Sequence, residues 1–74
     1  MLTKIEISPD ICNGKAVIKG TRITVSTILG YLSAGDSIDG IIRGYPQISR
    51  EDILACLDYA KQLTDNHATI SLTA

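Results

Sequence analysis

The chain has 74 residues, a formal net charge of −1, and 45 % hydrophobic residues. This length predicts one small domain, and no apolar run approaches the roughly 18 residues that a membrane-spanning helix needs. The charge balance excludes a general affinity for nucleic acid, and two distant cysteines with one histidine lack the number and spacing of ligands for a zinc site.

Residues 1–20 predict a β-ribbon arm made of two short strands and a turn. Polar and apolar side chains alternate over residues 4–7, as in a half-buried strand. Asn13-Gly14 is a strong turn dipeptide, and residues 15–18 form a second extended run. We expect the chain to turn sharply at Gly20, which has no Cβ, so that residues 20–25 join the ribbon to the first helix.

Two helices are predicted next. Thr24 is placed to cap a helix over about residues 25–34, which should end at Gly35. Asp36 or Ser37 should cap a second helix, which ends before Tyr45-Pro46 because a residue preceding proline resists helical backbone angles. Two glycines within it, at positions 40 and 44, make it the weakest element on propensity grounds.

Ser49 and Asp52 open a third helix with a capping-box pattern. Apolar residues at helical spacing predict its buried stripe, namely Ile53, Leu54, Leu57, Ala60 and Leu63. The helix should fade near residue 65. In the tail, residues 66–74, Ile70 and Leu72 alternate with polar residues, which fits either a frayed end or an extended arm that pairs with another segment.

The predicted fold class is therefore mainly α with a small N-terminal β-sheet. It forms one domain, with the ribbon over 1–20, a three-helix unit over 24–65 and the tail over 66–74. Three short helices joined by turns of three to five residues fit a trihelical, helix-turn-helix type of bundle. We assign structural roles at its joints to six residues: Gly20, Thr21, Arg22, Asp52, Tyr45 and Pro46.

A core of this size rarely supplies more than about 3–5 kcal/mol of net stability, so small domains commonly rely on disulfides, a metal or a partner chain. Residues 1–8 lack the hydrophobic stretch of an export signal, and we expect Cys12 and Cys56 to be reduced thiols of a cytoplasmic protein. Of these three sources of stability, a partner chain remains, and we expect a homo-oligomer, in the simplest case a dimer.

Charge is distributed unevenly along the chain. Residues 1–25 hold four basic and two acidic residues, a balance of +2, whereas residues 26–74 hold three basic and six acidic residues, a balance of −3. Any surface that faces an anion should therefore lie at the N-terminal end. The candidate DNA contacts are Lys15, Lys19 and Arg22, with Arg50 and Lys61 on the third helix.

Each candidate site also has a structural interpretation. Arg22 has two possible roles. It could contact a phosphate or an acidic residue of a partner, or it could fix the ribbon to the helices by bonding helix-end carbonyls or the Asp52 carboxylate. We favour the structural role. The outward positions of the third helix are net acidic, so a solvated face or protein interface is favoured over base contact. His67 and Cys56 have no catalytic partners, and we predict no enzyme, metal or cofactor site and no small-molecule substrate.

A series of short motifs follows in order along the chain: Ser8-Pro9-Asp10-Ile11, Gly14-Lys15, Val17-Ile18-Lys19-Gly20-Thr21-Arg22-Ile23, Gly35-Asp36-Ser37-Ile38, Tyr45-Pro46, Glu51-Asp52-Ile53, Ala55 and Tyr59-Ala60. Through these motifs the chain resembles the domain of unknown function 433 family between about Ile5 and Ala60. It departs from the family pattern at Ala16, where proline is usual, and at Gly40 and Gly44, where helix-favouring polar residues are usual.

The resemblance implies a homeodomain-like trihelical fold behind a small sheet. It also implies a VapB-like antitoxin of a type II toxin-antitoxin module, which would bind a PIN-like ribonuclease toxin and operator DNA. Two alternatives stay open: a helix-turn-helix DNA-binding regulator without a toxin, and a structural homo-oligomeric interaction domain.

Overall fold

The computed structural model describes residues 4–66. The elements follow in the order β1 (Ile5–Glu6), a 3₁₀ turn η2 (Cys12–Gly14), β2 (Val17–Ile18), α1 (Val25–Ser33), α2 (Ile38–Gly44) and α3 (Arg50–Asp65). The predicted class, mainly helical with a small N-terminal antiparallel sheet, is confirmed. The predictions for most of the tail lie outside the described residues.

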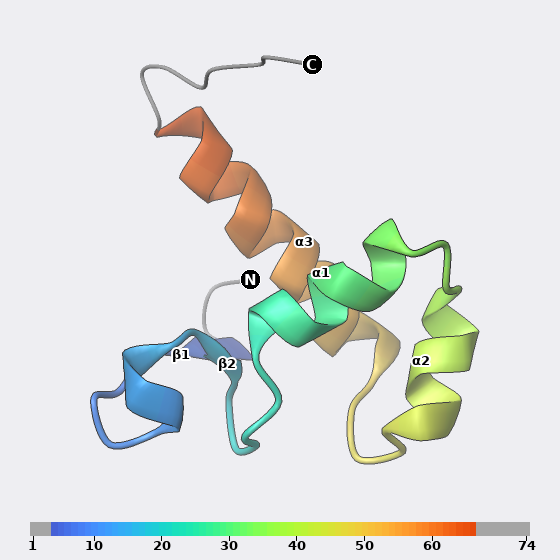
Figure 1. Ribbon diagram of the computed structural model, residues 1–74, viewed down its shortest axis with the longest axis horizontal. Helices are drawn as coiled ribbons and strands as arrows, with labels where there is room; N and C mark the ends of the chain where they lie inside the picture. Colours follow the sequence, from blue (N-terminus) through green and yellow to red (C-terminus); the bar gives the residue numbers. More distant parts are fainter. Residues whose placement is uncertain (1–3, 67–74) are drawn as a thin grey trace.

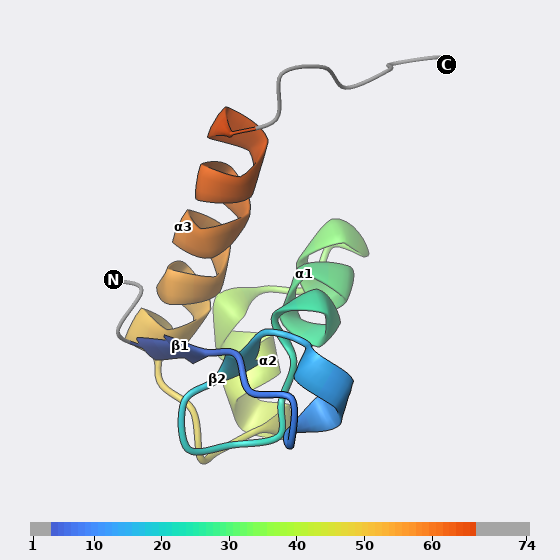
Figure 2. The same cartoon turned by 90° about the vertical axis from the view of Figure 1, so that its left-hand side faces the viewer.

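Figures 1 and 2 show one arrangement from two sides: the ribbon lies at the base of α1 and α3, and α2 lies at the far end of α1. In both views the last two turns of α3 extend past every other element. We call residues 60–65 the projecting end of α3, because Tyr59 still packs against the core. This end has neighbours on fewer sides than the first half of the helix, which packs against α1, α2 and β1.

The ribbon is shorter than its sequence pattern predicts. Its strands have two residues each, with Ile5 opposite Ile18 and Glu6 opposite Val17. The chain between them is occupied by the η2 turn, in which Asn13 takes a left-handed conformation with φ of 58°. Val17 also bridges to Thr24, so β2 is held between β1 and the start of α1.

The strand-to-helix joint forms through Thr21, as a loop closed by short-range hydrogen bonds. The Thr21 hydroxyl donates to the Ile18 carbonyl at 2.7 Å and accepts from the Ile23 amide at 3.0 Å. The Ile18 amide in turn donates to the Ile23 carbonyl at 2.9 Å. Gly20 has a φ of +82°, which confirms the sharp turn predicted there.

The helix starts agree with their sequence signals. Thr24 caps α1 by accepting from the Thr27 amide, and Ser37, rather than Asp36, caps α2 by accepting from the Gly40 amide. At α3 the capping box is complete: the Ser49 hydroxyl accepts from the Asp52 amide at 3.2 Å, and the Asp52 carboxylate accepts from the Ser49 amide at 2.9 Å. The helix α2 ends at residue 44, as the Tyr-Pro break predicts.

The core is aliphatic and lies where the ribbon meets the three helices. Its centre includes Ile18, Ile28, Ile53 and Cys56, each almost fully buried. The predicted stripe of α3 is partly wrong. Ile53 is buried, but three predicted members are exposed, namely Leu54 at 37 %, Leu57 at 40 % and Leu63 at 48 %. Ala55 and Cys56, which the prediction left out, are buried. Compared with the predicted orientation, α3 is turned about its axis so that residues 55 and 56 face the core. We attribute this to its packing against β1 as well as against α1 and α2.

Candidate functional site

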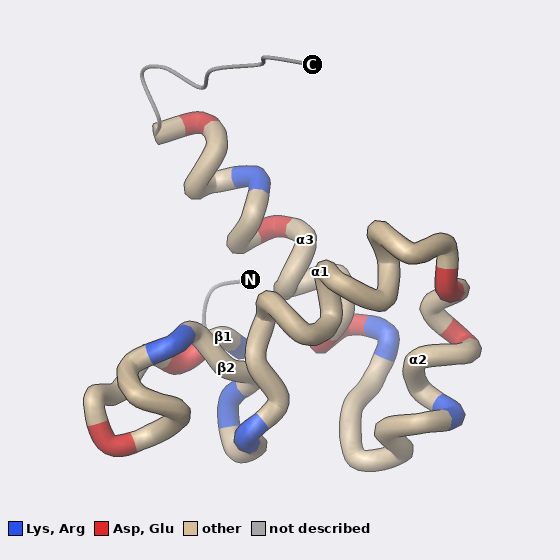
Figure 3. Tube along the Cα trace, viewed as in Figure 1, with Lys and Arg blue, Asp and Glu red and all other residues tan. Residues whose placement is uncertain are grey.

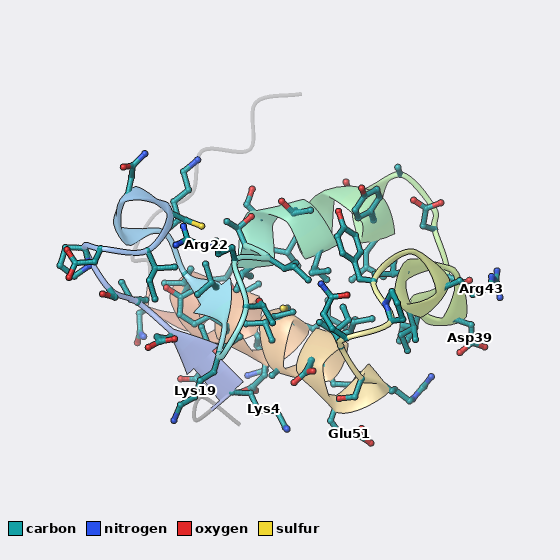
Figure 4. The ribbon with its side chains drawn as sticks, turned by 90° about the horizontal axis from the view of Figure 1, so that it is seen from below. Lys4, Lys19, Arg22, Asp39, Arg43 and Glu51 are labelled. Atoms are coloured by element: carbon teal, nitrogen blue, oxygen red, sulfur yellow. The ribbon has the colours of Figure 1, made fainter. Side chains whose placement is uncertain are left out.

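The predicted DNA-contacting residues do not gather into one patch. Lys19 lies beside Lys4, whose carbonyl accepts from the Lys19 amide at 2.8 Å, and Figure 4 shows both side chains at the same edge of the ribbon. Arg22 lies on the other side of the ribbon from these two lysines (Figure 4). Sequence reasoning missed Lys4 because strand pairing, which no local pattern encodes, brings it next to Lys19.

Arg50 is the first residue of α3 and Lys61 lies in its second half. Figure 3 shows acidic and basic positions interspersed along this helix. Eleven residues separate Arg50 from Lys61, which corresponds to about 16 Å along a helix axis. The Lys61 ammonium donates to the Asp65 carboxylate at 2.7 Å, so its charge is locally compensated. The first turn of α3, where a recognition helix would meet base edges, contains Glu51 and Asp52.

The predicted bond between Arg22 and Asp52 is wrong. Asp52 bonds the Ser49 amide and lies 3.8 Å from the Lys4 ammonium, so Lys4 is the residue that links the ribbon to α3. Within residues 4–66 the Arg22 guanidinium has no hydrogen-bond or ion-pair partner, and its backbone carbonyl accepts from the Cys12 thiol. The pairing of β1 with β2 and the packing of β1 on α3 bring the Lys4 ammonium to 3.8 Å from the Asp52 carboxylate.

The two cysteines occupy different environments. Cys56 is fully buried, and burial together with the nearby Asp52 carboxylate raises the pKa of its thiol to about 11. A thiol of this kind is a poor nucleophile, in keeping with the prediction of an inert cysteine. Cys12 is half-buried in the η2 turn, and His67 lies outside the described residues.

Among residues 4–66, no group of three or more His, Cys, Asp or Glu side chains is placed to hold a metal ion. Within the same residues, no helix combines the length and apolar character that crossing a membrane requires.

Two hollows on the surface of the helical unit are candidates for binding. The first, which we call the α1–α3 groove, has a volume of about 410 Å³ and lies between the start of α1 and the projecting end of α3. Leu63, on its wall, is 48 % exposed. Apolar and small side chains dominate the lining, which comprises Lys15, Ala16, Thr24, Val25, Ser26, Leu29, Tyr59, Ala60 and Leu63.

The second hollow, which we call the tyrosine recess, has a volume of about 370 Å³ and lies between the end of α1 and α2. Tyr31 and Tyr45 meet there with ring centroids 6.0 Å apart and planes at 56°, and their hydroxyls are hydrogen-bonded at 3.2 Å. This hydrogen bond raises the pKa of Tyr45. The remaining lining residues are Asp36, Gly40, Ile41 and Gly44.

Neither hollow was predicted from the sequence. The Tyr45-Pro46 pair was assigned a structural role at the end of α2, and its partner Tyr31 was assigned none. A spacing of fourteen residues between the two tyrosines says nothing of contact, because their meeting depends on how the α1–α2 turn folds back.

Comparisons with known proteins agree with the fold. The crystal structure of a DUF433 member protein from Anabaena variabilis superimposes with a TM-score of 0.78 at 34 % identity, and the match covers 84 % of this chain and 61 % of that one. An uncharacterized protein of Sinorhizobium fredii, y4eO, is 33 % identical over 54 residues, which are 73 % of this chain and 24 % of that protein. The chain thus spans about a quarter of this relative and under two thirds of the solved structure.

A family model described as "Protein of unknown function (DUF433)" matches residues 5–60, which include every element from β1 to most of α3. The match contains the strand-to-helix joint, the Tyr-Pro break and the capping box, the features on which the fold depends. This chain therefore belongs to the DUF433 family, as its sequence resemblance predicts.

Proposed function

We propose that the chain is a protein-binding adaptor, an antitoxin-like component of a toxin-antitoxin module whose partner is a PIN-like ribonuclease. The observation that carries the proposal is the α1–α3 groove, with the half-exposed Leu63 on its wall. Burying such a side chain against a partner removes apolar surface from water, the main source of affinity in protein association.

The groove suits a segment of protein better than a nucleic acid. Its lining contains aliphatic and small side chains, and Lys15 is the charged residue among them. An amphipathic helix could lay its apolar face into this groove, in the recognition mode that reads residues spaced by three and four. An acidic residue on that helix would pair with Lys15, so an acidic partner such as a carboxylate-rich nuclease fits the charge.

The electrostatics of α3 support a protein partner over DNA. Its outward face contains three acidic residues besides its two basic ones, namely Glu51, Asp58 and Asp65 against Arg50 and Lys61. A helix placed in the major groove would bring these carboxylates close to phosphates, which costs free energy.

The test is co-purification of the chain with the protein encoded beside it, comparing two matched variants. Leu63→Glu places a charge on the groove wall, whereas Leu57→Glu places the same charge on α3 outside the groove, at a similar exposure of 40 %. We expect Leu63→Glu to abolish co-purification and Leu57→Glu to preserve it. Equal retention by both variants, with thermal unfolding unchanged, would contradict the groove as the docking site.

A second candidate function, DNA binding by a regulator, is favoured by one observation, the adjacent Lys4 and Lys19 at the ribbon edge. It predicts retention of duplex DNA from the gene's own promoter, with affinity that falls steeply as salt is added. Lys4→Gln with Lys19→Gln should remove that binding. The control is Lys61→Gln, because Lys61 is paired with Asp65 at the far end of α3. No retention at low salt rules this candidate out.

A further inference from the structure

We propose that the tyrosine recess is a binding site for a guanidinium group, such as the side chain of an arginine. The recess shares no lining residue with the α1–α3 groove, so this inference stands independently of the adaptor function. Its volume of about 370 Å³ lies at the lower end of the range of about 300–1,000 Å³ typical of ligand pockets, which suits a small group.

The chemistry of the walls points to a planar cation. Tyr31 and Tyr45 contribute two aromatic rings tilted by 56°, and a guanidinium stacks on such faces through cation–π attraction. The hydrogen bond between their hydroxyls uses one proton, so the pair retains acceptor lone pairs for N–H donors of a ligand.

Asp36 supplies the negative charge. Its amide donates to the Tyr31 carbonyl at 3.0 Å, and Asp36 lines the recess together with Tyr31. Within residues 4–66 its carboxylate has no hydrogen-bond or ion-pair partner, so both oxygens can accept the two parallel N–H bonds that a guanidinium offers. Arg43, the basic residue of α2, is not among the lining residues and lies with Asp39 on the outer side of α2 (Figure 4), where its guanidinium is 3.6 Å from the position of a Cβ built at Gly40.

Gly44 is a lining residue of the recess that carries no side chain. It lies in the last turn of α2, and a Cβ built there would have no atom within 4 Å, so packing does not demand glycine at this position. Alanine would make a better helix former, and its methyl group would be added at a residue that lines the recess. Gly40 differs, because a Cβ there would lie 3.1 Å from the Ser37 hydroxyl that caps α2.

The proposal is tested by titrating the folded chain with N-acetyl-arginine amide and following tyrosine and backbone amide NMR signals. The matched ligand control is N-acetyl-citrulline amide, which keeps the shape of arginine but has no charge. We expect saturable shifts at Tyr31, Asp36 and Tyr45 with the arginine probe, and none with citrulline. A parallel titration with ethylguanidinium distinguishes two sources of the guanidinium group. If the site accepts a free small cation, ethylguanidinium should bind as tightly as N-acetyl-arginine amide. If it accepts an arginine of a peptide, the arginine probe should bind more tightly, and both results support the site.

Three variants complete the test. Asp36→Asn should weaken binding by about tenfold, since it removes a charge-assisted pair. Gly44→Ala should raise the unfolding temperature yet abolish binding. The control is Gly30→Ala, because Gly30 is an equally open helical glycine outside the recess. This variant should also raise the unfolding temperature but leave binding unchanged. Equal binding of citrulline and arginine, absence of saturable shifts, or full binding by a folded Gly44→Ala variant would overturn the proposal.

Discussion

At the scale of single residues, function and stability depend on neighbours that are far apart in sequence. Lys4 shows this best: it lies beside Lys19 and faces the Asp52 carboxylate, although 48 residues separate it from Asp52. Its ion pair is half-exposed at a separation of 3.8 Å, so it contributes at most about 1 kcal/mol. The pair therefore orients the ribbon more than it stabilises the fold.

The thiols give a prediction at this scale. We expect iodoacetamide at pH 8 to label Cys12 quickly and Cys56 only at the rate of global unfolding, because Cys56 is fully buried and its pKa is raised to about 11. Mass spectrometry should show one modified thiol in the native chain and two in urea. Rapid labelling of both thiols without denaturant would contradict the buried position of Cys56.

The same shift predicts how stability depends on pH. A thiol whose folded-state pKa lies above its ordinary value of 9.0 contributes stability that is fully present below pH 9. That contribution is lost as the pH rises from 9 towards 11, because the unfolded chain releases its proton first. Urea midpoints should fall over this interval, and Cys56→Ala should flatten the fall.

At the scale of elements, local signals in the sequence predicted the helix starts and ends well. The capping box at Ser49 and Asp52, the Thr24 cap and the Tyr45-Pro46 break all act through hydrogen bonds or clashes within four residues, so a short stretch of sequence contains the whole cause. The buried side of α3 could not be predicted in this way. Apolar side chains lie on several sides of that helix, and its packing against β1, α1 and α2 leaves the leucines exposed and buries Ile53, Ala55 and Cys56.

The observed buried face of α3 can be tested by comparing alanine substitutions at a buried and at an exposed position. Ile53→Ala removes a fully buried side chain and should destabilise the chain by about 2–5 kcal/mol. Leu57→Ala removes a side chain that is 40 % exposed and should cost less than about 1.5 kcal/mol. Urea unfolding measures both, and a larger loss for Leu57→Ala would indicate that α3 is rotated as the sequence pattern first suggested.

At the scale of the whole molecule, the mainly helical class and the order of elements followed from periodicity and turns, whereas both hollows arise from tertiary packing. The α1–α3 groove exists because α3 is longer than the helix beside it, and the tyrosine recess exists because the turn after α1 folds back on α2. The predicted Arg22–Asp52 contact failed for the same reason. Residue types were visible in the sequence, but their distances were set by the register of a two-residue sheet.

The projecting end of α3 has a consequence for hydrogen exchange. These six residues continue a packed helix but have few tertiary neighbours of their own, and helical structure without tertiary packing is only marginally stable in water. The amide protons of residues 60–65 should therefore exchange with deuterium by local fraying, much faster than those of Ile53 and Cys56. A partner segment bound in the α1–α3 groove should slow hydrogen exchange selectively at the projecting end. The pattern of deuterium uptake along this one helix would therefore report whether the groove is occupied, without any label on the partner.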